Sequence, residues 1–137
     1  MVGFTNDNKL VLGKFSKREA LNMGIRDAVE FGPFLIINGE ASKVLGNGGW
    51  GIAPRTAIGQ RQDGIVLFLV INGRIPTSIG ADMNDLIDIM QRYGAYNAAN
   101  MDGGSSTELV INNKIINKPV AGGRDGLRDM PTFWIVK

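Results

Sequence analysis

Two turn sequences, Asn72-Gly73 and Asn112-Asn113, constrain the fold of this chain most strongly. Each follows a short apolar segment and is typical of a β-hairpin, in which two antiparallel strands are joined by a tight turn. Antiparallel neighbours argue against a purely parallel, doubly wound sheet. We therefore predict an α+β domain, with a mixed, mainly antiparallel sheet of about seven strands and two main helices packed on it.

Short apolar runs bounded by Gly, Pro, Asn or Asp predict the strands of this sheet. Residues 65–71 are apolar on both faces and are predicted to form its central buried strand, while 55–60 form a strand at its edge. The Asn72-Gly73 hairpin is predicted to return through 74–78. The other predicted strands are 9–13, 34–37, 95–101, 108–111, 114–116 and 132–136.

Capping residues and apolar periodicity predict the helices. Ser16, with Glu19 three residues later, is a capping-box sequence and predicts a helix over 17–23, followed by another short helical turn over 25–30. Apolar residues recur at helical spacing from Met83 to Tyr93, which predicts an amphipathic helix ended by Gly94. The Gly-rich segment 40–53 is predicted to be a mobile loop, and 118–131 a second loop.

The composition excludes several kinds of chemistry. The 137 residues contain no His and no Cys, which excludes a Ser-His-Asp triad, a thiol nucleophile and zinc sites built on these residues. The net charge is +2 without a basic run, so nucleic-acid binding is poorly supported. The longest apolar run is too short to span a membrane, and the N-terminus lacks the features of a signal peptide. The length fits a single domain over 1–137, and the sequence leaves its oligomeric state open.

The segment Asp102-Gly103-Gly104-Ser105-Ser106-Thr107 is the strongest candidate site. A carboxylate ends a strand of small residues, two glycines let the backbone approach a ligand closely, and three hydroxyl side chains supply donors and acceptors. Asp102 is therefore a candidate base or nucleophile. The alternative is a structural β-turn that Asp102 caps.

Further candidates are weaker when each is taken alone. Arg55 follows Pro54 at the start of a predicted strand and could hold a phosphate or carboxylate, or lie on the surface as an ordinary charge. Arg128 and Asp129, before the last predicted strand, could belong to the site or form a solvated salt pair. Asn38 and Trp50 are candidates for substrate contact that could equally be a turn residue and a loop anchor.

Four segments together resemble the phosphodiester glycosidase family. They are PFLIING (33–39), APRTAIG (53–59), NMDGGSST (100–107) and RDMP (128–131), and they occur in the family's order. The resemblance covers the chain from about Gly3 to its end. It departs from the family in two ways: an N-terminal segment with an Asn-Gly-Gly-Phe-Phe-like strand has no counterpart here, and the third glycine often found before the motif's serine is absent.

The resemblance implies hydrolysis of a sugar 1-phosphodiester, such as an α-N-acetylglucosaminyl phosphodiester of envelope or exopolysaccharide glycans. No cofactor is expected and no metal-ligating residue is assigned, while dependence on Ca²⁺ or Mg²⁺ stays open. The resemblance also implies an extracytoplasmic or envelope-associated location and a phosphorylated carbohydrate as partner. Asp102 and Arg55 are the implied catalytic residues. The implied substrate-binding residues are Thr56, Gly103, Gly104, Ser105, Ser106, Asn38 and Arg128.

On this hypothesis Asp102 acts as nucleophile or base at the anomeric carbon, while arginines neutralise the departing phosphate. The second carboxylate of an ordinary glycosidase is not identified, and Glu40, Asp63 and Asp129 are its candidates. Two alternatives stay open. One is a module that binds phosphorylated glycans without cleaving them. The other is a homodimeric aspartic protease, which fits poorly because Gly103 stands where that motif requires a hydroxyl residue.

Overall fold

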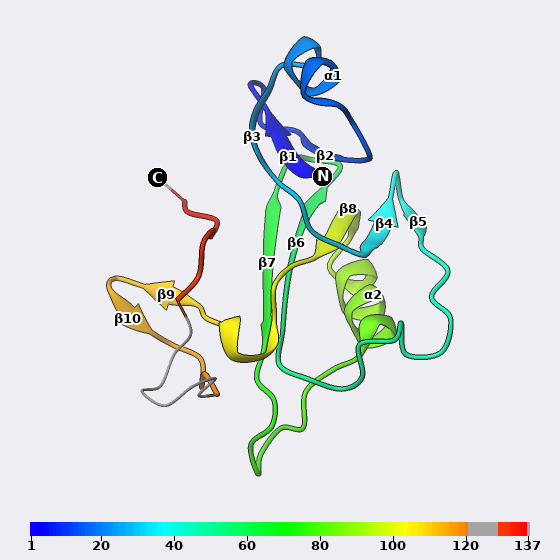
Figure 1. Cartoon of the computed structure of the whole chain (residues 1–137). Helices are drawn as coiled ribbons and strands as arrows, with labels where there is room; N and C mark the ends of the chain where they lie inside the picture. Colours follow the sequence, from blue (N-terminus) through cyan, green and yellow to red (C-terminus); the bar gives the residue numbers. More distant parts are fainter. Residues whose placement is uncertain (121–128, 137) are drawn as a thin grey trace.

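The largest element of the fold is a five-stranded antiparallel sheet (Figure 1). The structure is a computed structural model and describes residues 1–120 and 129–136. The strand order of this sheet is β5-β4-β8-β6-β7, and every pairing in it is antiparallel. The strands are β4 (Phe34–Ile37), β5 (Glu40–Ala41), β6 (Arg55–Arg61), β7 (Val66–Ile71) and β8 (Ala95–Asn100).

Two smaller sheets complete the strand pairing. Strands β1 (Val2–Thr5), β2 (Leu10–Leu12) and β3 (Ile25–Val29) form an antiparallel sheet in the order β2-β1-β3. Strands β9 (Val110–Ile111) and β10 (Lys114–Ile115) form the predicted hairpin about Asn112-Asn113. The α+β class and the mainly antiparallel pairing are confirmed, with ten strands in three sheets among the described residues.

The helix α2 (Met83–Arg92) covers one face of the five-stranded sheet (Figure 1). Asp82 caps its N-terminus through the backbone N–H groups of Asn84 and Asp85, at 2.8 and 3.0 Å. Its apolar stripe is buried as the sequence predicts, except that Tyr93 follows the last helical residue and is 66% exposed. Each large buried side chain of the stripe contributes about 1.5–3 kcal/mol. The buried stripe consists of Met83, Leu86, Ile87 and Met90.

The opposite face of the sheet packs against the N-terminal sheet. Ile58 and Ala99 form a buried cluster there with Val2 and Phe4. The side chain of Gln60 adds a polar link, because its Oε1 accepts from the Leu10 N–H at 2.7 Å and its Nε2 donates to the Asn8 and Gly64 carbonyls. The sheet that carries β6 and β8 is therefore held from both sides.

The predicted helix over 17–23 forms as α1 (Lys17–Asn22), with the Ser16–Glu19 capping box in place. The helical turn predicted over 25–30 is wrong, because these residues form β3 and pair with β1, a strand the sequence did not predict. Gly24, at φ +67°, ends α1 and redirects the chain into β3. A tertiary partner thus overrides the local helical preference.

The strand positions predicted for 55–60 and 65–71 are also wrong. β6 lies between β8 and β7, whereas β7 is the edge strand. One face of β7 packs on the cluster around α2 through Leu67 and Leu69, while Val66 and Phe68 are 37% and 43% exposed. Apolar side chains on both faces therefore do not reveal how many neighbours a strand has.

Two further predicted strands do not form among the described residues. A tight hairpin at Asn72-Gly73 requires positive φ at both positions, but in this loop the positive φ, +55°, is that of Arg74, and the chain turns between Ile75 and Ser78. Gly73 instead permits close packing, because a Cβ there would lie 2.6 Å from the Pro54 nitrogen. Residues 132–136 also form no strand, although Trp134 packs edge-on against Phe4, with ring centroids 5.4 Å apart.

Candidate functional site

The turn that follows β8, residues 101–107, is bound to the start of β6, and we call it the Asp102 turn. The Met101 N–H donates to the Thr56 carbonyl at 2.9 Å, and the Gly104 N–H donates to the Pro54 carbonyl at 2.8 Å. The Thr56 hydroxyl donates to the Asp102 carbonyl. Asp102 and Arg55, far apart in sequence, are thus brought to the same end of two neighbouring strands.

The two glycines of this turn have different structural roles. Gly103 is extended, and a Cβ on it would lie 2.9 Å from the Pro54 carbonyl oxygen and 3.4 Å from the Arg55 Cα. The close approach that the sequence predicts therefore occurs, but to the protein's own backbone. Gly104 adopts a φ of +61°, which favours glycine, and begins the short 3-10 helix Gly104–Ser106.

Arg55 is a buried charged residue near this turn, and hydrogen bonds hold its guanidinium in place. Its side chain is buried, with the residue 4% exposed, and the guanidinium donates to the carbonyls of Ala81 at 3.1 Å, Trp50 at 3.0 Å and Gly51. Burial lowers the pKa of Arg55 from its ordinary value, and the nearby Arg74 charge lowers it further. Arg55 therefore holds the Gly-rich segment and the residue before the α2 cap to β6.

Some polar groups around the turn are buried without a hydrogen-bond partner among the described residues. They include the Oδ1 of Asn100 and the hydroxyls of Ser106 and Thr107. Glu108 likewise has a buried Oε1 without such a partner, and the sequence analysis did not select it. Buried polar atoms of this kind usually find a partner, so their grouping beside Asp102 marks the turn as unusual.

The structure does not bring every predicted site residue to this turn. Ile36 of β4 lies opposite Ala98, so Asn38 lies near the start of β8, whereas Asp102 follows its end. The separation is roughly five strand residues, or about 16 Å. Glu40 shares the end occupied by Asn38, and Asp63 lies beyond the other end of β6, paired with Arg61 at 2.7 Å.

The remaining candidates fall into two groups. Arg128 lies outside the described residues, and Asp129 is exposed. Trp50 is 55% exposed in the Gly-rich segment, where Arg55 binds its carbonyl. Residues 42–52 form neither helix nor strand, which confirms most of the loop predicted over 40–53, but residues 40–41 form β5 and pair with β4.

Arg74 is a charged residue near the turn that the sequence analysis missed. Its Nη1 and Nη2 lie 3.7 and 3.9 Å from the position that a Cβ on Gly104 would occupy. Within residues 1–120 and 129–136, no group accepts a hydrogen bond from its guanidinium and no carboxylate forms an ion pair with it. The available signal was Asn72-Gly73-Arg74, which the sequence analysis interpreted only as a hairpin.

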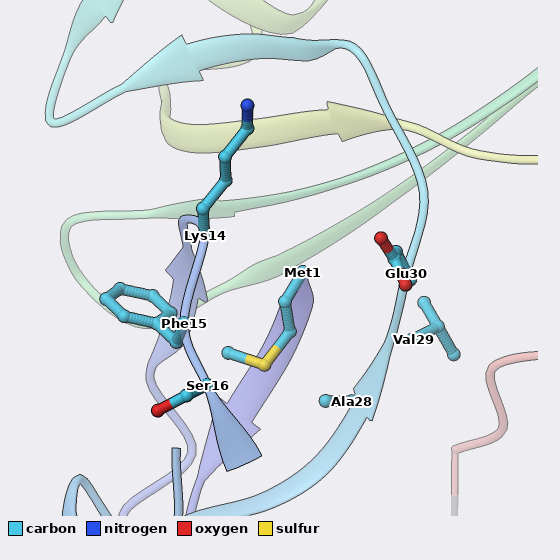
Figure 2. A pocket seen from close by; sticks show the side chains of 7 residues that line it. All are labelled: Met1, Lys14, Phe15, Ser16, Ala28, Val29 and Glu30. Carbon is cyan, nitrogen blue, oxygen red and sulfur yellow. The ribbon is translucent and has the colours of Figure 1, made fainter. Parts of the chain in front are cut away.

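A surface hollow of about 610 Å³ lies elsewhere, at the N-terminal sheet. Figure 2 shows Met1, Phe15 and Val29 among the side chains that line it, and none of the candidate residues takes part. In the part of the chain that the structure describes, no group of three acidic side chains is placed to hold a metal ion. The helices described there are all too short and too polar to cross a bilayer.

Comparison with known proteins gives a match to one family model. The model is that of the phosphodiester glycosidases, and it matches residues 1–137. The SPbeta prophage-derived uncharacterized protein YomE of Bacillus subtilis (strain 168) is 38% identical over 64 residues, which are 47% of this chain and 10% of that protein.

Solved structures give the same fold. The catalytic domain of zebrafish N-acetylglucosamine-1-phosphodiester alpha-N-acetylglucosaminidase, auto-inhibited by its pro-peptide, matches 86% of this chain with a TM-score of 0.72 and 22% identity. This chain spans 44% of that one. A Burkholderia pseudomallei K96243 protein assigned as exported is 37% identical over 56% of this chain and 15% of its own, with a TM-score of 0.50.

Proposed function

Because the chain belongs to the phosphodiester glycosidase family, we propose that it hydrolyses the glycosidic bond of a sugar 1-phosphodiester, with Asp102 as the catalytic carboxylate. The observation that carries this proposal is the attachment of the Asp102 turn to the start of β6, which brings a carboxylate and cationic side chains into one region. A carboxylate beside cations fits cleavage of a bond whose leaving group is an anion.

Asp102 acts in this proposal as nucleophile or as base for water at the anomeric carbon. The phosphate is a good leaving group, so neutralising its charge replaces much of the protonation that an ordinary glycoside requires. Arg55 contributes positive charge near Gly103 and holds the Gly-rich segment through the Trp50 and Gly51 carbonyls. Thr56 fixes the Asp102 carbonyl, and Ser105 and Arg128 are proposed to contact the phosphate.

The finer features of the substrate also belong to this proposal. An N-acetylglucosaminyl group is the first sugar to test, because the zebrafish relative is named for that activity. An extracytoplasmic location agrees with the name of the Burkholderia pseudomallei relative, which describes an exported protein, and a glycan of the cell envelope is the substrate that we propose for such a location. This chain spans 44% and 15% of these two relatives.

The test is hydrolysis of an α-N-acetylglucosaminyl 1-phosphodiester by the 137-residue chain and by Asp102→Asn. We expect Asp102→Asn to lower kcat/KM by roughly 10³-fold with unchanged folding, since removal of a catalytic proton-transfer or nucleophilic group costs about this much. Asp63→Asn is the matched control, because Asp63 is a carboxylate at the far end of β6 and should leave turnover unchanged. Turnover by Asp102→Asn within twofold of the parent would refute the assignment.

A module that binds phosphorylated glycan without cleaving it is the second candidate function. The observation in its favour is that the Arg55 guanidinium is already bound to three carbonyls of the protein. Titration with N-acetylglucosamine 1-phosphate, together with a product assay, separates the two candidates. Saturable binding without any release of sugar from the phosphodiester would favour the binding module.

A further inference from the structure

The loop between β7 and α2 carries a cation in a defined position. Arg74 has a φ of +55°, a conformation that is unfavourable for a residue with a side chain and is often found at functional sites. Hydrogen bonds hold this conformation. The Arg74 N–H donates to the Ile79 carbonyl at 3.2 Å, and Ile75 and Ser78 exchange two backbone bonds of 3.0 Å. The backbone that directs Arg74 is therefore fixed within its own loop.

The same loop is packed against the segment that holds the Asp102 turn. A Cβ on Gly73 would lie 2.6 Å from the Pro54 nitrogen, and one on Gly80 would lie 2.4 Å from the Ala53 carbonyl oxygen. The Pro54 carbonyl in turn accepts from the Gly104 N–H at 2.8 Å. Residues 53–54 thus join the Arg74 loop to the Asp102 turn, which fixes the position of the Arg74 backbone relative to Gly104.

The Arg74 guanidinium lies next to Gly104, where both terminal nitrogens are within 4 Å of the space that a Cβ would fill. Arg74 itself is exposed, and no group in the described residues accepts a hydrogen bond from its guanidinium. The Arg74 charge is also close enough to lower the pKa of the buried Arg55. Two like charges near one glycine turn repel each other, and an anion bound at the exposed Arg74 guanidinium would offset that repulsion.

We propose that Arg74 binds the phosphoryl oxygens of the substrate's leaving group and selects anionic over neutral leaving groups. This inference rests on the proposed function and adds a specificity-determining residue to it. A guanidinium presents a planar pair of N–H donors that matches two oxygens of one phosphate. A glycine at 104 leaves room for that phosphate, because a side chain there would occupy the space beside the guanidinium.

The reaction that Arg74 assists is a hydrolysis. The bond between the anomeric carbon and the phosphate oxygen breaks, and its electron pair stays on that oxygen. Water supplies the hydroxyl group of the released sugar, and its proton passes by way of Asp102 to the solvent. Arg74 binds the phosphate monoester more strongly as its negative charge grows, so its effect is largest in the transition state.

The test compares one charged and one neutral leaving group on the same sugar. The 137-residue chain, Arg74→Gln and Arg74→Lys are assayed on an α-N-acetylglucosaminyl 1-phosphodiester and on the neutral 4-nitrophenyl α-N-acetylglucosaminide. For Arg74→Gln we expect kcat/KM to fall about 100-fold on the phosphodiester and less than threefold on the neutral glycoside. Arg74→Lys should be intermediate, because it keeps the charge and loses the paired donors.

The control variant is Arg92→Gln, which removes an exposed arginine at the end of α2 and should leave both rates unchanged. A purely structural role for Arg74 would lower both rates by the same factor. Equal losses on the two substrates, or no loss on the phosphodiester, would therefore overturn the proposal.

A binding measurement separates this inference from the proposed function. Titration with N-acetylglucosamine 1-phosphate, followed by NMR shifts, should show at least tenfold weaker binding to Arg74→Gln than to the parent chain. If the parent binds with this dependence on Arg74 but releases no sugar from the phosphodiester, the anion site stands and the hydrolase function fails. If the parent hydrolyses the phosphodiester and Arg74→Gln binds and turns over equally well, the hydrolase stands and the Arg74 site fails. Absence of both binding and turnover in the parent overturns both.

Discussion

The substitution Arg55→Lys tests whether Arg55 acts mainly by holding the Gly-rich segment. The guanidinium makes three hydrogen bonds to carbonyls, from Nε to Ala81 and from Nη2 to Trp50 and Gly51. A lysine keeps the charge but has a single nitrogen at the end of a flexible chain, and it can recover only part of this set.

The expected loss follows from these contacts. Hydrogen bonds from a charged donor contribute about 1.5–3 kcal/mol each, and two of the three are lost. The Ala81 carbonyl also accepts from the Ala53 N–H at 3.2 Å and stays satisfied. Water can reach the exposed Trp50 segment and reduces the cost further. We therefore expect the free energy of unfolding to fall by about 3 kcal/mol, with a Tm lower by about 10 °C for a chain of this length.

The assay is thermal unfolding followed by circular dichroism, combined with amide hydrogen exchange over residues 42–52. Exchange in this segment should accelerate more than exchange in β6, because the segment loses its attachment to the sheet. Arg61→Lys is the matched control, since Arg61 ends the same strand and forms an exposed ion pair with Asp63. The control should change the free energy of unfolding by less than about 1 kcal/mol.

The reasoning is refuted if the Tm values of Arg55→Lys and Arg61→Lys lie within 2 °C of each other and amide exchange over residues 42–52 is unchanged. Arg55 then does not hold the Gly-rich segment to β6. Loss of hydrolysis under those conditions would return Arg55 to direct contact with substrate, as the sequence analysis proposed.

Two further substitutions test the close approach at the turn and the electrostatics of the N-terminal sheet. Gly103→Ala places a Cβ 2.9 Å from the Pro54 carbonyl oxygen and should lower the free energy of unfolding by about 3 kcal/mol. Gly49→Ala is the control, because a Cβ there would have no atom within 4 Å and only the φ of +75° opposes it, which should cost about 1 kcal/mol. Both losses are measured by unfolding in urea. Equal losses would show that the approach at Gly103 is not tight. Hydrogen bonding to Lys9 lowers the pKa of Asp7 to about 2, so an NMR titration should show its carboxylate charged well below pH 3.8, and Lys9→Met should raise that midpoint. Because this pKa is lowered on folding, the stabilising effect of the charged Asp7 is present above pH 3.8 and is lost as the pH falls towards 2.

The elements that the sequence predicts well are those specified by neighbouring residues. The Ser16–Glu19 pair fixes the start of α1 through contacts within one turn, and both bonds of the capping box are present. The apolar stripe of α2 repeats over ten residues and leaves little room for another structure. Asn112 and Asn113 both adopt the positive φ that a tight hairpin requires, at 51° and 60°.

The order of strands in the sheet depends on contacts that no single segment contains. β6 has a glycine and polar residues, yet it occupies an interior position, because it pairs with both β8 and β7. Its Gly59 lets Met90 of α2 approach closely. β7 is the longest wholly apolar strand among the described residues, yet it lies at the edge. Residues 25–29 likewise become β3 only because β1 offers a partner. These outcomes are set by pairing between distant segments, which local propensity does not encode.

The residues of the candidate site also differ in whether neighbouring residues or distant contacts determine their positions. Asp102 and its glycines were predicted from one continuous motif, and the structure adds that Gly103 is needed for contact with the protein's own backbone at Pro54. Arg74 could not be selected from its own segment, because a hairpin at Asn72-Gly73 would have directed that arginine elsewhere. Only the absence of the hairpin, together with the packing of Gly73 on Pro54, brings Arg74 to Gly104. Gly73, which the sequence indicates as a hairpin residue, is therefore better explained by its close packing on Pro54. That packing places the exposed Arg74 guanidinium beside Gly104 of the Asp102 turn.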